Sequence, residues 1–350
     1  MIKTTYYQDL TKMNTFGMKV KARCFMEYDS VADLVDIEFE ELARPVLHIG
    51  GGSNLLFTDD FKGTVLHSKI NFIEVLDDNG KDGDVLVSVG AGVVFDDFCD
   101  WAAKEGLWGV ENLSYIPGEV GASAVQNIGA YGVEVKDVIH KVYCYDTVEE
   151  EFVSFPVEEC GYGYRDSIFK KPEIKGRYIV THVVFALSRD PQPKLDYGHL
   201  KEAVTSPEGE AKQLTPDMIR KVIIRIRKEK LPEPSVMGSA GSFFKNPVIT
   251  PEHYARIEAA AKAELGTDYK VPHYDLTDGT VKVPAAWMIE QCGWKGRRSG
   301  GAAVYEKQPL VIVNYTGEAF PEEIIGLERR IIDSVKKKFD IELHPEVEHI

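Results

Sequence analysis

The chain lacks the sequence signals of several common protein classes. None of its five cysteines forms a CxxC pair, and no close group of Cys and His has the spacing of a zinc site. We therefore expect no metal, and interpret the cysteines as free thiols in a reducing compartment. No apolar run approaches the roughly 20 residues of a transmembrane helix, and the first residues lack the apolar core of a signal peptide. These absences predict a cytoplasmic protein.

Positive charge is also scarce, because 41 Lys and Arg residues stand against 56 Asp and Glu residues, which gives a net charge of −15. A surface this acidic repels phosphate backbones and anionic lipids, so we expect neither nucleic acid nor a membrane as a partner. A local pocket of Arg, Lys and backbone N–H groups remains compatible with a nucleotide ligand. A chain of 350 residues, 44% of them hydrophobic, predicts a globular protein of two or three domains. We further expect it to be a monomer.

Hydrophobic periodicity predicts strands mixed with helices. The expected strands are Pro45–Ile49, Thr64–His67, Asp84–Val89, Lys141–Tyr145, Glu151–Phe155, Tyr178–Leu187 and Val311–Tyr315. Helical spacing or start signals predict helices that begin near Phe95, Thr215, Thr250, Pro284 and Pro321. The two prolines of Leu231–Pro234 indicate a linker and a domain boundary. The stretch from Pro117 to Gly132 has little periodicity, and no element is predicted there.

The first glycine-rich segment is Gly50-Gly51-Gly52-Ser53-Asn54. Successive glycines are expected where φ must be positive or where a ligand comes close to the main chain. Ser53 and Asn54 add polar groups for a diphosphate or a ribityl chain. For an isolated segment of this kind, a tight surface turn is the more common interpretation. Neither this segment nor Gly90–Phe95 has the GxGxxG spacing, which disfavours a Rossmann domain.

The second segment runs from Ile116 to Gly132 and interleaves glycines with small residues, which leaves room for a large flat ligand. Backbone N–H groups at such turns form anion-binding nests suited to a pyrophosphate. An irregular stretch this long is uncommon in a compact domain unless it is functional. We therefore predict a cofactor site that includes Gly118, Gly121, Ala122, Ser123, Gln126, Asn127, Gly129, Ala130, Tyr131 and Gly132.

Two further segments carry single polar residues among glycines and aromatics. Arg165 lies in Gly161–Lys170, where its planar fork can be presented to a carboxylate. For this segment taken alone, a surface Arg–Asp pair is the more common interpretation. Ser242 follows Gly241 and precedes two phenylalanines. The spacing differs from G-x-S-x-G, and no His/Asp pair is evident, so this serine is better interpreted as a proton donor or hydrogen-bonding group than as a nucleophile.

Taken in order, these segments resemble the UDP-N-acetylenolpyruvoylglucosamine reductase family of peptidoglycan synthesis. The resemblance begins at Asn14–Gly17, continues through the four segments, and ends at His344–Val347, so it covers nearly the whole chain. Residues Leu195–Leu200 resemble the tyrosine-bearing loop of the longer, type I form. One departure is Glu119–Val125, where the family more often has a Thr and a Pro.

The resemblance implies an α+β fold, in which a vanillyl-alcohol-oxidase-type (PCMH-like) FAD-binding domain of two subdomains is followed by a smaller α+β substrate-binding domain. The expected segments are residues 1–70 for the first FAD-binding subdomain and 71–230 for the second, with the tyrosine loop near 190–205. Residues 231–340 would form the substrate-binding domain, and 341–350 would return to the active site.

The resemblance also implies an enzyme, UDP-N-acetylmuramate dehydrogenase, with noncovalent FAD and with NADPH as reductant. Ser242 matches the family's proton donor, and Arg165 and Glu346 match the residues around the substrate carboxylate. Because like charges disfavour ionisation, we expect Glu346 to be protonated or bridged. The residues expected to bind the uridine diphosphate part or to close over it are Tyr197, Arg227, Lys230, Lys245, Asn246, Tyr274 and Lys282.

Two other functions remain compatible with the sequence. One is a different flavin oxidoreductase of the same fold, acting on an alcohol or a sugar. The other is a nucleotide-sugar sensor without chemistry. Each lysine or arginine above, taken without the family, would more often be a solvated surface charge, and Glu346 alone would be interpreted as a tail residue.

Overall fold

The computed structural model describes residues 1–77, 84–198, 200–204 and 214–350, and the chain divides into two compact units. The first unit contains Met1–Leu10, Val20–Gly52 and Asp60–Glu229, and the second contains Thr11–Lys19, Ser53–Asp59 and Lys230–Ile350. Two short N-terminal segments therefore pack with the C-terminal part. The expected division of the chain into residues 1–70, 71–230, 231–340 and 341–350 remains a prediction. Residues 199 and 205 of the expected tyrosine loop lie outside the described residues.

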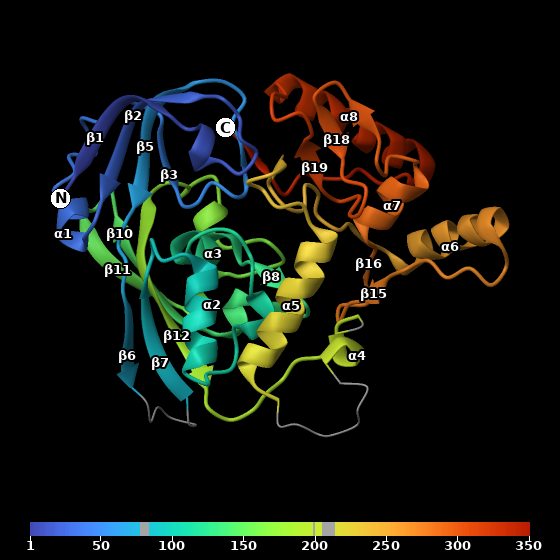
Figure 1. Cartoon of the computed structure of the whole chain (residues 1–350), viewed down its shortest axis with the longest axis horizontal. Helices are drawn as coiled ribbons and strands as arrows, with labels where there is room; N and C mark the ends of the chain where they lie inside the picture. The colour runs from blue at the N-terminus through green and yellow to red at the C-terminus, as the bar shows by residue number, and fades with distance from the viewer. Residues whose placement is uncertain (78–83, 199, 205–213) are drawn as a thin grey trace. The chain divides into compact units, whose positions relative to one another are not determined.

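The first unit begins with a four-stranded sheet in the order β1-β2-β5-β3 (Figure 1). Its strands are β1 (Lys3–Asp9), β2 (Lys21–Tyr28), β5 (Phe61–Ser68) and β3 (Val46–Ile49). β1 is antiparallel to β2, whereas β2, β5 and β3 are parallel. The short helix α1 (Val31–Val35) follows β2. Because parallel strands end at the same edge, the ends of β2, β5 and β3 bring Glu27, His67 and Ile49 side by side.

A five-stranded antiparallel sheet follows, in the order β11-β10-β12-β7-β6. Its strands are β11 (Glu151–Pro156), β10 (Ile139–Asp146), β12 (Tyr178–Ser188), β7 (Asp84–Gly90) and β6 (Ile73–Asp77). The valines of β7 share a buried core with α2 (Phe95–Lys104), α3 (Val120–Gln126) and the inward side of β12. The first unit also contains the hairpin β8 (Gly129–Ala130) and β9 (Val133–Glu134), α4 (Leu200–Val204) and α5 (Pro216–Lys230).

The helix α3 is the main element that the sequence did not predict. It lies inside the glycine-rich stretch, and its residues VGASAVQ are mostly small. Small residues give almost no hydrophobic period, so the usual signal of an amphipathic helix is missing. Asn127 ends α3 in the left-handed conformation, with φ of 46°.

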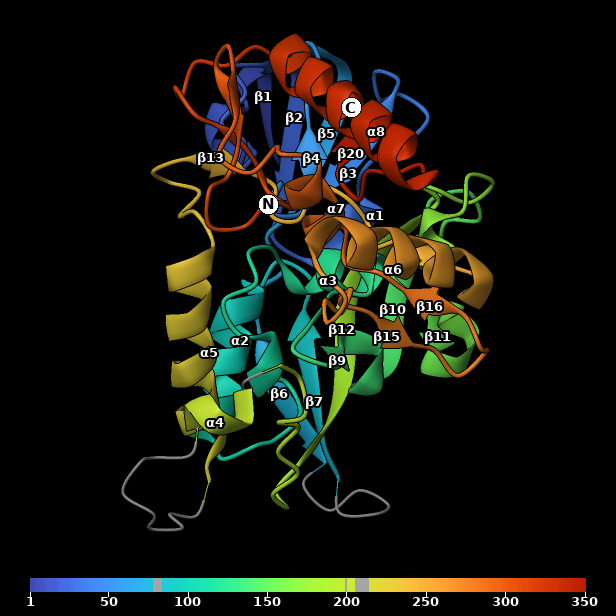
Figure 2. The same cartoon turned by 90° about the vertical axis from the view of Figure 1, so that its right-hand side faces the viewer.

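The second unit is built on short strands and the helices α6, α7 and α8 (Figures 1 and 2). A four-stranded sheet has the order β13-β19-β18-β17, and a three-stranded sheet has the order β14-β16-β15. The strands are β13 (Gly238–Ser239), β19 (Ile312–Asn314), β18 (Ala302–Val304), β17 (Arg298–Ser299), β14 (Val248–Ile249), β16 (Val281–Lys282) and β15 (Tyr274–Asp275). The pair β4 (Leu55–Leu56) and β20 (Glu348–His349) is parallel and joins the C-terminal end to an N-terminal segment.

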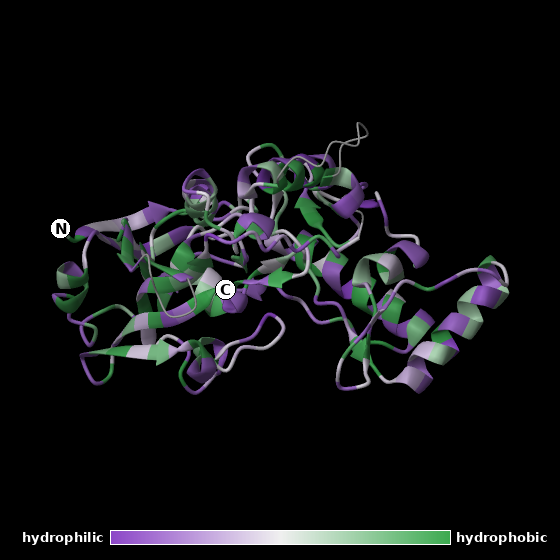
Figure 3. Ribbon diagram, turned by 90° about the horizontal axis from the view of Figure 1, so that it is seen from below, coloured by the Kyte–Doolittle hydropathy of each residue, from purple (hydrophilic) through white to green (hydrophobic). Residues whose placement is uncertain are grey.

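The helices of the second unit are α6 (Pro251–Leu265), α7 (Ala285–Gln291) and α8 (Pro321–Phe339). Helix α8 has a continuous buried stripe and packs against β18 and β19. Helix α6 mixes hydrophilic and hydrophobic residues along its length (Figure 3), and its buried residues are Ile257 and Ala261. Among the helices that the structure describes, none combines the length and the apolar composition that a membrane crossing requires.

A buried histidine in the first sheet makes stability pH-dependent. His48 on β3 accepts a hydrogen bond of 2.6 Å from the Tyr28 hydroxyl, and burial, with a smaller contribution from the charge of His67, lowers the pKa of His48 to about 4. The unfolded chain binds this proton near pH 6.5. The stabilisation is therefore complete above that value and is lost as the pH falls toward 4, by up to roughly 3 kcal/mol.

We therefore expect His48→Gln, whose amide can still accept from Tyr28, to lose less stability than the parent chain between these two pH values. Urea unfolding at several pH values measures the difference. His140→Gln, at an exposed histidine of the same unit, is the matched control and should follow the parent chain. Parallel stability curves for His48→Gln and the parent would contradict the assignment.

Candidate functional site

The two glycine-rich segments of the first unit lie in contact with one another. A Cβ atom added to Gly51 would lie 3.4 Å from the Cα atom of Gly118, and one added to Gly50 would lie 3.0 Å from the Cβ atom of Ala122. Such an approach of main chain to main chain is possible because both positions lack a side chain. The structure thus brings Gly50 and Gly51 against the start of α3, as a shared cofactor site would require.

Several polar groups of the second segment are used within the protein. The N–H groups of Val120 and Gly121 each donate at 2.9 Å to the carbonyls of Val93 and Ala91, so these two donors already have partners. The Ser123 hydroxyl donates to the carbonyl of Val120 at 2.7 Å. Ser123 therefore shapes α3, and its hydroxyl proton points into the helix.

Asn127 and Gln126 follow with different roles. The Asn127 amide donates to the Gly163 carbonyl at 2.7 Å and to Glu134 at 3.2 Å, and its oxygen accepts from the Lys136 N–H. This side chain therefore fixes the turn after α3. The Gln126 oxygen accepts from Lys170 at 2.7 Å, whereas its Nε2 is buried with no hydrogen-bond partner among the described residues.

Arg165 is held tightly against the glycine-rich segment. It has a φ of 55° within a turn closed by hydrogen bonds between Gly163 and Asp166. Its guanidinium donates to the carbonyls of Asn127 at 3.2 Å and Gly129 at 2.6 Å. A Cβ atom on Gly129 would lie 2.9 Å from Nη1 of Arg165, so this position requires glycine. Gly129, which is predicted from the sequence to be a cofactor-binding residue, therefore also makes room for the Arg165 guanidinium.

Tyr131, Tyr197 and Arg227 form a second group in the first unit. The two tyrosine rings meet edge to face with centroids 5.9 Å apart, and Tyr197 also lies beside Gly132, whose φ of 80° favours glycine. The Arg227 guanidinium donates to the Tyr115 carbonyl at 3.1 Å. Burial lowers the pKa of Arg227, and the nearby Tyr131 hydroxyl opposes this shift.

In the second unit, Ser242 and Glu346 lie on segments joined by their main chains. The Glu346 N–H donates to the Phe243 carbonyl at 2.8 Å, and the Lys245 N–H donates to the His344 carbonyl at 2.9 Å. Phe243 is completely buried, while Ser242, in the turn that Gly241 opens with φ of 68°, is exposed. The buried ring thus anchors the turn that carries Ser242, and the main chain after this turn pairs with the C-terminal segment.

The end of the first glycine-rich segment also reaches this turn. The Asn54 amide donates to the Glu346 carbonyl at 3.1 Å, and the Glu348 N–H donates to the Asn54 carbonyl at 3.0 Å. Ser53 and Asn54 belong to the second unit, whereas Gly50–Gly52 belong to the first. The two halves of this predicted cofactor segment therefore pack with different parts of the chain.

The remaining polar candidates of the second unit lie along the three-stranded sheet. The Asn246 oxygen accepts from the Ala285 N–H at the start of α7, at 2.9 Å. Lys282 on β16 pairs with Tyr274 on β15, and its ammonium lies 5.5 Å from the centroid of that ring. Lys230 ends α5, where the chain enters the second unit. Ser242, Glu346, Asn246, Tyr274 and Lys282 thus share one unit, and Arg165, Tyr197 and Arg227 share the other.

Known proteins resemble both units. The family model described as UDP-N-acetylenolpyruvoylglucosamine reductase, C-terminal domain, matches residues 233–350, and a model described as FAD binding domain matches residues 23–151. A UDP-N-acetylenolpyruvoylglucosamine reductase of Bacteroides fragilis (strain YCH46) is 50% identical over 342 residues, which cover 97% of this chain and 98% of that protein. The chain belongs to the UDP-N-acetylenolpyruvoylglucosamine reductase family.

Two further UDP-N-acetylenolpyruvoylglucosamine reductases are similar to this chain over nearly its whole length. The reductase of Porphyromonas gingivalis (strain ATCC 33277) is 44% identical over 348 residues, with 97% of each chain covered. The crystal structure of the reductase of Thermus caldophilus has a TM-score of 0.66 and 24% identity, and the match covers 100% of this chain and 98% of that one. The predicted α+β fold with an FAD-binding domain is confirmed.

The residues of the first unit suit an FAD cofactor, as the match to an FAD binding domain implies. The matched residues include Gly50–Gly52 and Gly118–Asn127. The approach of Gly51 to Gly118 leaves main chain without side-chain cover, and the buried Nε2 of Gln126 is a donor in need of an acceptor. FAD offers acceptors on its diphosphate and on its ring edge, so the residues present suit this group.

Three residues that lie among the candidate site residues were not predicted from the sequence. They are Lys170, Glu119 and His67. The Lys170 ammonium donates to Gln126 and, at 2.8 Å, to the Arg165 carbonyl, and so joins the two predicted segments. Its position at the end of the Arg165 segment was the available signal. Glu119 and His67 form a hydrogen bond of 2.9 Å beside Gly50. Nothing in the local sequence indicates that pair, because it depends on strand register.

Proposed function

We propose that this chain reduces UDP-N-acetylglucosamine enolpyruvate to UDP-N-acetylmuramate, with FAD as cofactor and NADPH as reductant. Membership in the family and the FAD-binding domain support the overall activity. The single observation that carries the mechanism is the main-chain pairing of the Ser242 turn with the Glu346 segment. Two residues from distant parts of the sequence, one with a hydroxyl and one with a carboxyl group, are thereby held on neighbouring segments of the chain.

The reaction sets two electrostatic tasks for the protein. When bound, FAD supplies hydride transfer from NADPH to the vinyl carbon of the enolpyruvyl group. The addition leaves negative charge beside the substrate carboxylate, and this dianion is poorly stable in water. The site must hold the charge and deliver one proton to the α-carbon.

Ser242 is the proposed proton donor. Its hydroxyl is exposed on the turn after Gly241, which carries no side chain to cover it. Glu346 is the proposed second group at the α-carboxylate, protonated or bridged because like charges disfavour ionisation. The pairing through Phe243 keeps the two residues in a fixed relation while Ser242 loses and regains its proton.

Arg165 is the proposed charge-holding group. Part of its fork is bound to the carbonyls of Asn127 and Gly129, which fixes the plane of the guanidinium. Pre-orientation of this kind costs no reorganisation when charge develops. Arg227, Lys230, Lys245, Asn246, Tyr274 and Lys282 are proposed to bind the uridine diphosphate part.

Tyr197 is the proposed lid residue. Its edge-to-face contact with Tyr131 connects the tyrosine loop to the glycine-rich segment of the FAD-binding domain. A lid that closes on the substrate restricts water around the anion and strengthens each electrostatic contact inside the site.

The proposal predicts a yellow protein that releases FAD on denaturation and oxidises NADPH only when the enolpyruvyl sugar is present. Anaerobic mixing separates the half-reactions, since NADPH alone should bleach the flavin and the sugar should restore it. Reoxidation by oxygen but not by the sugar would instead support an oxidase of alcohols or sugars. A folded, colourless protein that cannot be reconstituted with FAD would remove the proposal.

A further inference from the structure

His67 is buried between two carboxylates at the carboxyl ends of three parallel strands. It lies on β5, directly opposite Glu27 on β2 and Ile49 on β3. Its Nε2 lies 2.9 Å from Glu119 and its Nδ1 lies 3.3 Å from Glu27, while the imidazole side chain is only 3% exposed. The carboxyl ends of parallel strands are where open sheets bind ligands.

The contacts of His67 tie together two carboxylates. Both of its ring nitrogens face a carboxylate oxygen, and an ionised carboxylate only accepts hydrogen bonds. His67 pairs with the buried Glu119 carboxylate, whereas Glu27 also has the ammonium groups of Lys3 and Lys69 at 3.7 Å and 3.8 Å.

Glu119 connects this charged group to both glycine-rich segments. It is the residue before α3, yet it makes no side-chain cap there, and its carboxylate turns to His67 instead. A Cβ atom on Gly50 would lie 3.3 Å from Glu119 Oε2, and Gly50 follows Ile49, the strand partner of His67. The contact between His67 and Glu119 therefore joins the end of β5, next to the end of β3, to the start of α3.

We propose that His67 and Glu119 are further cofactor-positioning residues, whose hydrogen bond holds the two FAD-binding segments together. This inference rests on the proposed function. Without His67, the Glu119 carboxylate beside Gly50 would lose this partner, and the start of α3 would no longer be tied to the sheet edge from which the first glycine-rich segment starts.

The test is the affinity of the protein for FAD, measured by equilibrium dialysis, with the absorbance spectrum of the bound flavin as a second readout. His67→Ala removes the partner of Glu119 and should weaken FAD binding by about tenfold. His67→Gln, whose amide can donate to Glu119, should recover part of the loss. Glu119→Ala removes the other partner and should weaken FAD binding to a similar degree as His67→Ala.

Glu105→Gln, at an exposed glutamate of the same unit, is the matched control and should keep the parent affinity. If His67→Ala does not fold, as circular dichroism would report, the affinity of Glu119→Ala decides the test. Parent affinity in folded His67→Ala or Glu119→Ala would overturn the inference while FAD binding itself stands. A parent chain that binds no FAD would overturn the proposed function instead.

Discussion

Replacing Ser242 by alanine should slow the reoxidation of the flavin by the enolpyruvyl sugar by about 10²–10⁴-fold, the usual range for removal of a general acid. Reduction of the flavin by NADPH should keep its rate, because no proton reaches the sugar in that step. Stopped-flow measurement of flavin absorbance, with each half-reaction started separately, gives both rates.

The turn that carries Ser242 should survive the substitution. Its anchors are the buried Phe243 ring and the main-chain bonds to Leu310 and Glu346, none of which uses the serine side chain. Ser235→Ala, at an exposed serine of the linker, is the matched control and should change neither rate. Loss of both half-reactions in Ser242→Ala, or of neither, would contradict the proton-donor role.

Much of the secondary structure could be predicted from local sequence. The start of α5 follows Thr215, whose hydroxyl accepts from the Met218 N–H at 3.3 Å, and α6 begins after the Thr250 cap as its sequence predicts. The strands β3, β7, β10 and β12 agree with the predicted ones to within a few residues. These elements carry their own signals, because caps and hydrophobic periods act over a few residues.

The strands β1 and β2 were not predicted, and the reason is visible in their burial. The seven residues of β1 are all at least partly exposed, and β2 loses its alternation after Cys24. Strands of this kind are selected by their neighbours in the sheet, so their local pattern is weak. The membership of Thr11–Lys19 and Ser53–Asp59 in the second unit has the same long-range origin.

The candidate site likewise contains some residues that a local sequence pattern indicates and others that no local pattern indicates. The glycine-rich segments stood out by composition, and their residues gained roles from the resemblance to the family. The pairing of Phe243 with Glu346, and the contact of Glu119 with His67, depend on segments that are distant in sequence. Such contacts follow from topology, which a single sequence does not specify.

Replacing Arg220 by methionine should destabilise the first unit by about 1.5–3 kcal/mol, the usual contribution of hydrogen bonds to charged groups, because the Asp96 side chain is 25% exposed. Arg220 on α5 is 7% exposed and donates to Asp96 on α2 at 2.5 Å and 3.1 Å, and to Asp100 at 3.3 Å. Methionine fills the apolar part of the space, so the loss measures the uncompensated charge of Asp96.

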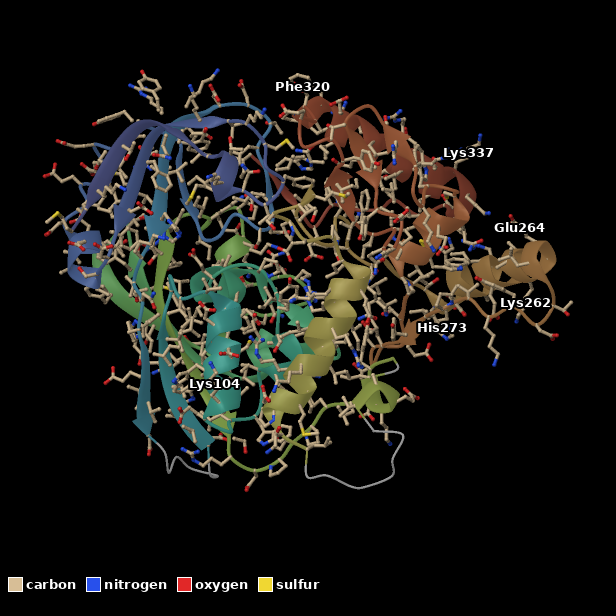
Figure 4. The ribbon with its side chains drawn as sticks, in the orientation of Figure 1. Lys104, Lys262, Glu264, His273, Phe320 and Lys337 are labelled. Carbon is tan, nitrogen blue, oxygen red and sulfur yellow. The ribbon has the colours of Figure 1, made fainter. Side chains whose placement is uncertain are left out.

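Urea unfolding measures the effect of Arg220→Met. An exposed ion pair on α2, the helix that carries Asp96, supplies the control. Lys104, labelled on α2 in Figure 4, forms an exposed pair of 2.6 Å with Asp100, so Lys104→Met should cost at most about 0.5 kcal/mol. Adding Asp96→Asn to Arg220→Met should recover part of the loss, because the buried charge is then gone. Equal costs for Arg220→Met and Lys104→Met, or no recovery in the double variant, would contradict a buried pair that ties α5 to α2.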